Sequence, residues 1–231
     1  MTVSQSKAIV LSCRPHAERQ LRVELLVSGS GVHNIFISRS KKGVGRGYWN
    51  LGNLLLMERI NRRGKIRLEP VKVIAAVMSA ARDLDVFHQL SFVLELARQL
   101  GRLSELGTDT FELICEYLAF LEDQGANELR LVTWQLALLG SLGMPMTLFP
   151  CQLTGQEPNG FSLNDGGAVS RSACRYALPI SSNALAIAHA AWHGDYSVDQ
   201  SKEVKPLLSL LSKVWQDLIG RPLKTATFLN L

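Results

Sequence analysis

The spacing of apolar residues changes once along the chain, from alternation to a helical period. Over the first 75 residues, apolar side chains alternate with polar ones in short runs that end at Gly, Asn or Ser, a pattern typical of half-buried strands. In the clearest run, Leu21, Val23 and Leu25 alternate with charged neighbours. The pattern predicts five strands, at residues 7–13, 21–27, 32–37, 54–60 and 66–73. Five short strands in so few residues predict a small closed or partly open barrel such as the OB-fold.

Beyond residue 78 the apolar residues fall three or four apart, as on one face of a helix. This spacing predicts helices at residues 84–97, 109–121, 129–139, 184–193 and 204–219, the second beginning near Asp109. Residues 147–181 carry several Gly and Pro and little period, so we expect an irregular insertion with a short hairpin there. The predicted fold is therefore α+β, with a five-stranded OB-fold barrel at residues 1–78 packed on a helical domain at residues 79–231.

Composition indicates a soluble globular protein. Of the 231 residues 47% are hydrophobic and 19% charged, and no apolar run approaches the ~18 residues that span a bilayer. The first residues do not predict a secretory signal. Four widely spaced cysteines without a CxxC motif do not predict a disulfide framework. We therefore expect a cytoplasmic protein with no membrane partner.

Positive charge is concentrated at the beginning of the chain. Residues 1–80 hold fourteen Lys and Arg against four Asp and Glu, a net charge of +10, whereas residues 81–231 hold eleven against sixteen, a net of −5. A division this sharp predicts that the basic part binds a polyanion, and we expect that polyanion to be nucleic acid.

Two glycine-containing basic stretches are the candidate DNA contacts. Glycines let a phosphate chain approach the backbone, and cations displace its counterions; on an OB-like barrel the two loops are expected to flank one groove. Trp49, beside the first stretch, either stacks on an unpaired base or lies in the core. The predicted DNA-binding residues are Arg39, Lys41, Lys42, Arg46, Trp49, Arg62, Arg63 and Lys65.

Signals for metal binding or catalysis are weak. His189 and His193 have the i, i+4 spacing of metal ligands, but Ala190 stands where a zinc protease has Glu. Cys151 and Cys174 resemble two halves of a zinc site that has lost its other cysteines, and two thiolates do not close a tetrahedral site. There is no P-loop, Rossmann or nucleophile motif. We therefore predict no cofactor, no metal and no enzymatic activity.

With these residues identified, the chain resembles the RecO family of bacterial recombination mediators over nearly its whole length. The opening strand and its Arg14-Pro15-x-x-Glu18 turn are similar to the beginning of that family, and the basic loop from Arg39 falls where the family has one. Further similar stretches are residues 21–27, 111–121, 134–143, 151–155, 166–170 and 220–224. Two departures are the missing cysteines around Cys151 and Cys174 and the sequence that follows Trp49.

The resemblance implies an N-terminal OB-fold and a helical body with a zinc-ribbon-like insertion, degenerate here. It implies binding to single- and double-stranded DNA, annealing of complementary strands, work with RecR, contact with the acidic tail of single-stranded DNA-binding protein, and indirectly loading of RecA. The protein is then expected near the nucleoid, with Arg130, Arg221 and Lys224 as partner-binding residues. The alternative is a protein-interaction adaptor whose basic head holds an acidic protein rather than DNA.

Overall fold

The structure is a computed structural model that describes residues 2–18, 20–38, 46–62, 65–151, 153–196 and 201–229. The chain forms two compact units, Met1–Gly125 and Ala126–Leu231, and each is described by itself. The change from strands to helices that suggested a boundary at residues 78 and 79 lies between Ala75 and Leu84. The compact units nevertheless divide at Gly125, because the first two long helices group with the strands.

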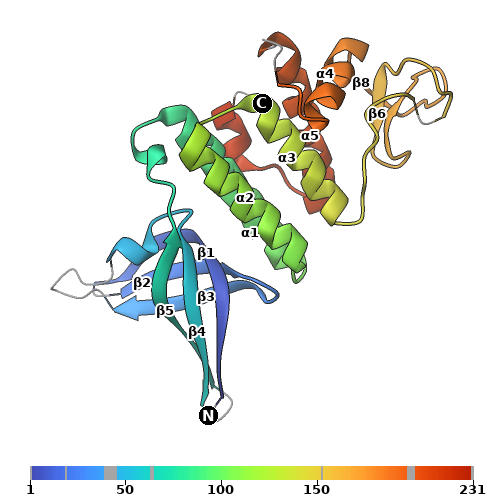
Figure 1. Cartoon of the computed structure of the whole chain (residues 1–231). Helices are drawn as coiled ribbons and strands as arrows, with labels where there is room; N and C mark the ends of the chain where they lie inside the picture. The colour runs from blue at the N-terminus through green and yellow to red at the C-terminus, as the bar shows by residue number, and fades with distance from the viewer. Residues whose placement is uncertain are drawn as a thin grey trace. The chain divides into compact units, whose positions relative to one another are not determined.

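The N-terminal unit is built on one antiparallel sheet of five strands in the order β3-β2-β1-β4-β5 (Figure 1). This confirms the predicted α+β class and strand-rich beginning. β1 is the central strand: its first half pairs with β4, where Thr2 is opposite Asn61, and its second half pairs with β2, where Ala17 is opposite Gln20. The strands are β1 (Thr2–Ala17), β2 (Gln20–Val27), β3 (Gly31–Ser38), β4 (Leu54–Arg62) and β5 (Lys65–Ala75).

One face of this sheet forms a hydrophobic core. The alternation seen in the sequence of β2 places Val23, Leu25 and Val27 on this face, where they are buried with Val10 of β1 and Leu55 of β4. Half-buried side chains of both edge strands pack against the same cluster, namely Ile35 and Ile37 of β3 and Leu68 of β5. The sheet therefore curls around one interior rather than lying flat.

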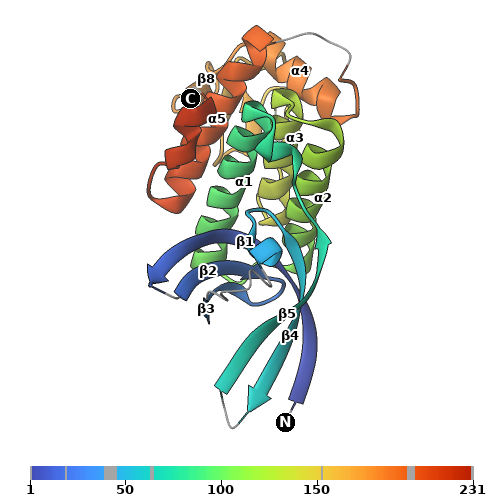
Figure 2. The same ribbon diagram turned by 90° about the vertical axis from the view of Figure 1, so that its left-hand side faces the viewer.

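The opposite face of β1, β2 and β3 lies against α1 (Figure 2). Asp83 begins this helix by accepting hydrogen bonds from the backbone N–H groups of Asp85 and Val86, as an N-cap does. Near the other end, Gly101 lets the helix approach closely, since a Cβ atom there would lie 2.7 Å from Leu26 Cδ1. The helical segments of this unit are η1 (Arg46–Trp49), η2 (Ser79–Ala81), α1 (Leu84–Leu103) and α2 (Thr108–Gln124).

The C-terminal unit consists of packed helices and a small sheet. α5 packs on α3 and α4, and the buried Trp215 of α5 donates its indole N–H to Gln135 Oε1 of α3 at 2.9 Å. The segment expected to be irregular contains a three-stranded sheet in the order β7-β6-β8. No helix in the described ranges is long and apolar enough to cross a membrane. The elements are α3 (Glu128–Ser141), β6 (Gly160–Ser162), β7 (Gly167–Val169), β8 (Leu178–Pro179), α4 (Ser182–Trp192), α5 (Ser201–Ile219) and η3 (Lys224–Leu229).

Candidate nucleic-acid interface

The strand ends that flank the two predicted basic loops lie at different levels of the sheet. The first follows Ser38, which pairs with Gln20, and Gln20 in turn pairs with Ala17 at the end of β1. The second is the β4–β5 hairpin, whose Arg62 and Lys65 are opposite one another beyond Thr2, at the beginning of β1. β1 has 16 residues, and a fully extended strand of that length spans roughly 50 Å. The register therefore does not support the expectation that both loops flank one groove.

The structure describes the backbone of three of the seven predicted cations. The backbones of Arg46, Arg62 and Lys65 are placed in η1, β4 and β5. Outside the described residues lie Arg39, Lys41, Lys42 and Arg63. Their contact with DNA stays a prediction.

Trp49 lies in the core of the sheet, so the prediction that it stacks on a base is wrong. Its side chain is 9% exposed and packs with the cluster that contains Val10 and Leu55. Asn53 holds η1 in place by donating its side-chain amide to the carbonyl oxygens of Gly47, at 2.7 Å, and Tyr48, at 3.1 Å. A buried ring offers no open face to a base, and the large apolar area of indole explains why it fills the interior.

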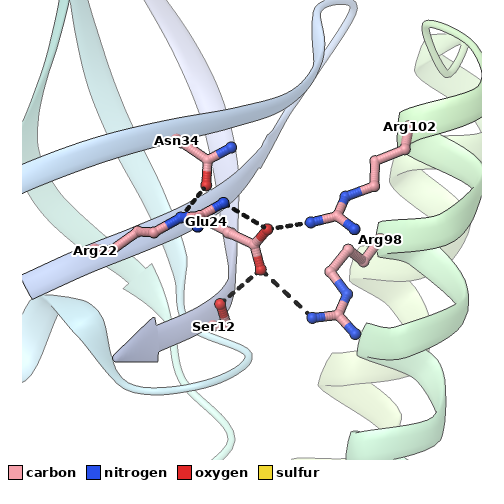
Figure 3. Close-up of polar contacts among 6 residues, drawn as sticks. All are labelled: Ser12, Arg22, Glu24, Asn34, Arg98 and Arg102. Atoms are coloured by element: carbon pink, nitrogen blue, oxygen red, sulfur yellow. Dashed lines mark hydrogen bonds and ion pairs between the residues drawn. The ribbon is translucent and has the colours of Figure 1, made fainter. Parts of the chain in front are cut away.

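A buried carboxylate joins the sheet to α1 (Figure 3). Glu24 of β2 has a side chain only 7% exposed. It accepts hydrogen bonds from the Ser12 hydroxyl at 2.8 Å and from Arg98 Nη1 at 3.4 Å, and Arg102 forms an ion pair with its other oxygen. Arg98 and Arg102 of α1 therefore both pair with one strand carboxylate, whose place in the alternation predicted only an outward-facing position.

The pKa of Glu24 is lowered below its ordinary value. Burial alone raises the pKa of a carboxyl group, but the hydrogen bond from Ser12 and the positive charges of Arg102 and Arg98 outweigh that effect. Glu24 therefore stays ionised at neutral pH, and its charge is compensated by neighbours rather than by water.

Ser12, Glu24, Arg98 and Arg102 form what we call the Glu24 cluster. Beyond it, the outer face of the sheet carries a row of exposed side chains that the sequence pattern did not single out. Phe36 of β3 is opposite Arg22 of β2, which is opposite Arg14 of β1. The Phe36 side chain is 56% exposed, and its ring centroid lies 4.7 Å from that of His16. The available signal was alternation, because Ile35 and Ile37 face the core and Phe36 must then point outward.

The predicted partner-binding residues lie in the C-terminal unit. Arg130, in the first turn of α3, donates from Nη1 to the Tyr196 hydroxyl at 2.6 Å, and its guanidinium carbon lies 5.4 Å from the centre of the Tyr196 ring. Arg221 follows the end of α5 and Lys224 begins η3, and both are exposed. Their roles stay predictions.

The two cysteines of the middle segment take part in separate hydrogen bonds. The sulfur of Cys151 accepts from the backbone N–H of Ser170 at 3.0 Å. The thiol of Cys174 donates to Asp165 Oδ2 at 3.1 Å, and the Ser162 hydroxyl donates to the same oxygen at 2.5 Å. Among the described residues, no three His, Cys, Asp or Glu side chains gather closely enough to hold a metal ion. These donors do not fit the zinc that a zinc-ribbon-like insertion implies.

The hydrogen bonds around the Cys151 sulfur change the pKa of its thiol. Burial raises the pKa of its thiol, but hydrogen bonds from the Thr154 hydroxyl and from the backbone N–H groups of Leu153, Thr154 and Ser170 outweigh this and lower the pKa. The lowered pKa favours the thiolate, but the sulfur of Cys174 has a different hydrogen-bond partner, Asp165, and two thiolates alone do not close a tetrahedral zinc site.

We expect the purified protein to contain less than stoichiometric zinc, and a chelator to leave its melting temperature unchanged. The physical reason is that a structural zinc site needs four protein ligands, and in the part of the chain that the structure describes no three His, Cys, Asp or Glu side chains gather to hold a metal ion. Elemental analysis and thermal unfolding with and without chelator test this expectation. Stoichiometric zinc that is lost in a Cys151→Ser variant would contradict it.

Comparison with known proteins identifies the family. The family model described as recombination protein O C terminal matches residues 81–226. A protein named DNA repair protein RecO from Rhodopseudomonas palustris (strain TIE-1) is 32% identical over 177 residues, covering 72% of this chain and 68% of the relative. Another of that name from Myxococcus xanthus (strain DK1622) is 28% identical over 168 residues, covering 70% and 69%. The chain belongs to the RecO family.

Proposed function

We propose that this protein acts in DNA repair and homologous recombination as a mediator. It binds single- and double-stranded DNA, anneals complementary strands and helps RecA load onto DNA that single-stranded DNA-binding protein has coated. The proposal is supported by the family and by relatives named DNA repair protein RecO. The observation that carries DNA binding is the net charge of +10 on residues 1–80, the part of the chain that contains all five strands of the N-terminal sheet.

The sheet is proposed to close into an OB-fold barrel. Its free edges are β3 and β5 in the order described above, and joining them would complete the ring of strands. This is supported by the shared core, since Ile37 of one edge strand and Leu68 of the other pack against the same buried cluster.

The proposed mechanism needs no covalent step. Cations of the basic loops neutralise phosphates without reading bases, so DNA is held regardless of its sequence. Two strands held close together with their mutual repulsion screened can then pair. Each loop cation that contacts a single strand adds about −0.7 to the slope of the logarithm of the binding constant against the logarithm of the salt concentration.

The proposed protein partners are RecR and the acidic tail of single-stranded DNA-binding protein, with RecA acting downstream. Arg130 is the proposed contact for an acidic tail because Tyr196 holds its guanidinium group by a hydrogen bond and by its ring face. Arg221 and Lys224 are proposed to contribute to partner binding as exposed cations. We place the protein in the bacterial cytoplasm, near the nucleoid.

Reversing the charge of Arg39, Lys41 and Lys42 to Glu tests the proposed DNA site. We expect affinity for single-stranded DNA to fall about 30-fold and the salt slope to become shallower by about 2, because three phosphate contacts are lost. Fluorescence anisotropy over a range of salt concentrations measures both quantities. The fold should persist, as thermal unfolding will show.

The matched control is a triple reversal in the C-terminal unit, at the exposed residues Arg175, Lys205 and Lys213. This control changes the net charge by the same amount as the loop variant and is expected to leave the salt slope of DNA binding nearly unchanged. An unaltered slope in the loop variant excludes residues 39–42 as the DNA site. Weak DNA binding by the wild type, together with tight binding of an acidic peptide, favours the adaptor instead.

A further inference from the structure

The exposed row on the outer face of β1, β2 and β3 combines an aromatic ring with cations. Phe36 is the exposed aromatic of β3, and His16 of β1 lies beside it, with an angle of 48° between the two rings. Arg22 and Arg14 continue the row across the two neighbouring strands. This is the face of strands 2 and 3, which OB-fold proteins use for oligonucleotides.

We propose that the Phe36 ring is a stacking platform for an unpaired base of single-stranded DNA, with Arg14 and Arg22 neutralising the adjoining phosphates. The inference rests on the proposed function and adds to it a site outside the basic loops. Aromatic rings stack on any base, so such a platform holds a strand without reading its sequence.

The position of Arg22 supports this role. Its Nε donates to Asn34 Oδ1 at 2.9 Å, which holds the guanidinium group over the sheet (Figure 3). Its side chain nevertheless remains 48% exposed. A guanidinium group that is positioned by Asn34 and still half exposed is suited to a phosphate, because little conformational freedom is lost on binding.

The neighbouring carboxylate does not cancel this positive charge. Glu24 lies 3.9 Å from Arg22 Nη2, but its charge is shared with Arg98 and with Arg102 on the side of α1. Glu24 is also the one carboxylate within β1, β2 and β3; Glu18 lies in the turn between β1 and β2. Arg14 makes no ion pair with any residue that the structure describes. The row therefore carries net positive charge beside an open ring.

The location of the row also fits a DNA strand. β3 ends at Ser38, two residues beyond Phe36, and the basic sequence from Arg39 follows directly. The row therefore lies two residues from the position in the chain where β3 ends and the proposed basic loop begins. An acidic peptide would gain from the arginines but has no base to place on the ring, so unpaired DNA is the ligand that uses both features.

The test compares Phe36→Ala, Phe36→Leu and Phe36→Trp in the full chain. The probes are a fluorescent oligothymidylate and a blunt duplex of the same length. We expect Phe36→Ala and Phe36→Leu to bind the single strand roughly tenfold more weakly, with an unchanged salt slope and unchanged duplex affinity. Phe36→Trp should bind as well as the wild type. Arg14→Ala should make the salt slope shallower by about 0.7.

The control is Tyr176→Ala, which removes another highly exposed aromatic ring and should leave binding unchanged. A Phe36→Ala or Phe36→Leu variant with wild-type affinity overturns the inference while leaving the proposed function intact. Equal losses for single strand and duplex, or loss of acidic-peptide binding alone, also overturn it. If the wild type binds no DNA at all, the proposed function fails as well.

Discussion

Replacing Glu24 by Ala is expected to lower the free energy of unfolding of the N-terminal unit by about 3 kcal/mol. The substitution removes the shared partner of Arg98 and Arg102 and leaves the Ser12 hydroxyl without its acceptor. Removing one member of a buried ion pair costs ~3–5 kcal/mol. We expect the lower end of that range because the Arg102 side chain is 40% exposed and recovers some hydration.

Chemical denaturation followed by circular dichroism measures this change. Glu24→Gln retains the size of the side chain and isolates the effect of charge, so it should be less destabilising than Glu24→Ala. Glu105→Ala is the matched control, because Glu105 is exposed and its loss should change stability by less than about 0.5 kcal/mol. Equal stability of Glu24→Ala and Glu105→Ala would refute the structural role of the cluster.

The contribution of Glu24 to stability also depends on pH in a definite direction. Its pKa is lowered in the folded state from the ordinary value of 4.5, so the folded protein binds the proton less readily than the unfolded chain. The stabilisation is therefore present above about pH 4.5 and is lost as the pH falls through the lower pKa of the folded state. The stability difference between wild type and Glu24→Gln should shrink over that range.

The Glu24 cluster also shows which structural features the sequence pattern predicts and which it does not. Alternation in β2 correctly separated Leu25, which faces the core, from Glu24, which does not. Alternation cannot show that α1 covers the second face, and Glu24, which alternation assigns to the outer face, is buried there. Nor can alternation show that both arginines of α1 form ion pairs with that carboxylate.

Sequence patterns likewise did not settle which of two aromatic residues, Trp49 and Phe36, is buried and which is exposed. Trp49 follows a basic loop in sequence, which suggested a stacking role, but the short helix η1 turns it into the core. Phe36 sits between two isoleucines, and three consecutive apolar residues look like one buried strand. Alternation between Ile35 and Ile37 indicates that Phe36 points outward, but only the register shows that Arg22 and Arg14 are its neighbours.

The basic and acidic parts of the chain correspond to strands and helices rather than to the two compact units. Residues 81–125, which contain α1 and α2, hold three Lys and Arg against nine Asp and Glu, yet they belong to the same unit as the basic sheet. Residues 126–231 are nearly neutral, with eight against seven. The acidic character predicted for the whole body of the chain therefore resides in one pair of helices.

In the C-terminal unit, Gly167→Ala is expected to lower the free energy of unfolding by at least about 3 kcal/mol. Gly167 has a φ of +126° and forms a parallel bridge with Thr147. A Cβ atom there would lie 2.2 Å from the Thr147 carbonyl oxygen and 2.8 Å from its backbone nitrogen. A backbone conformation reserved for glycine costs about 1–3 kcal/mol for other residues, and the collision with backbone atoms adds to it.

The collision cannot be relieved locally. Thr147 is held from both sides, because its N–H donates to Gly166 O at 2.9 Å and its carbonyl accepts from the N–H of Ala168 at 2.7 Å. Moving the Thr147 backbone away from an added methyl group would break both hydrogen bonds. The expected result is loss of the hairpin between β6 and β7, with faster proteolysis of residues 147–181 than in the wild type.

Gly166→Ala provides the matched control one residue away. Gly166 also has a positive φ, +77°, but a Cβ atom there would meet nothing within 4 Å. Only the conformational cost remains, about 1 kcal/mol, so this variant should keep the hairpin. Denaturant unfolding and limited proteolysis of both variants measure the difference. If Gly167→Ala is no less stable than Gly166→Ala, the close approach of Thr147 does not explain the paired glycines, and the middle segment is held by other contacts.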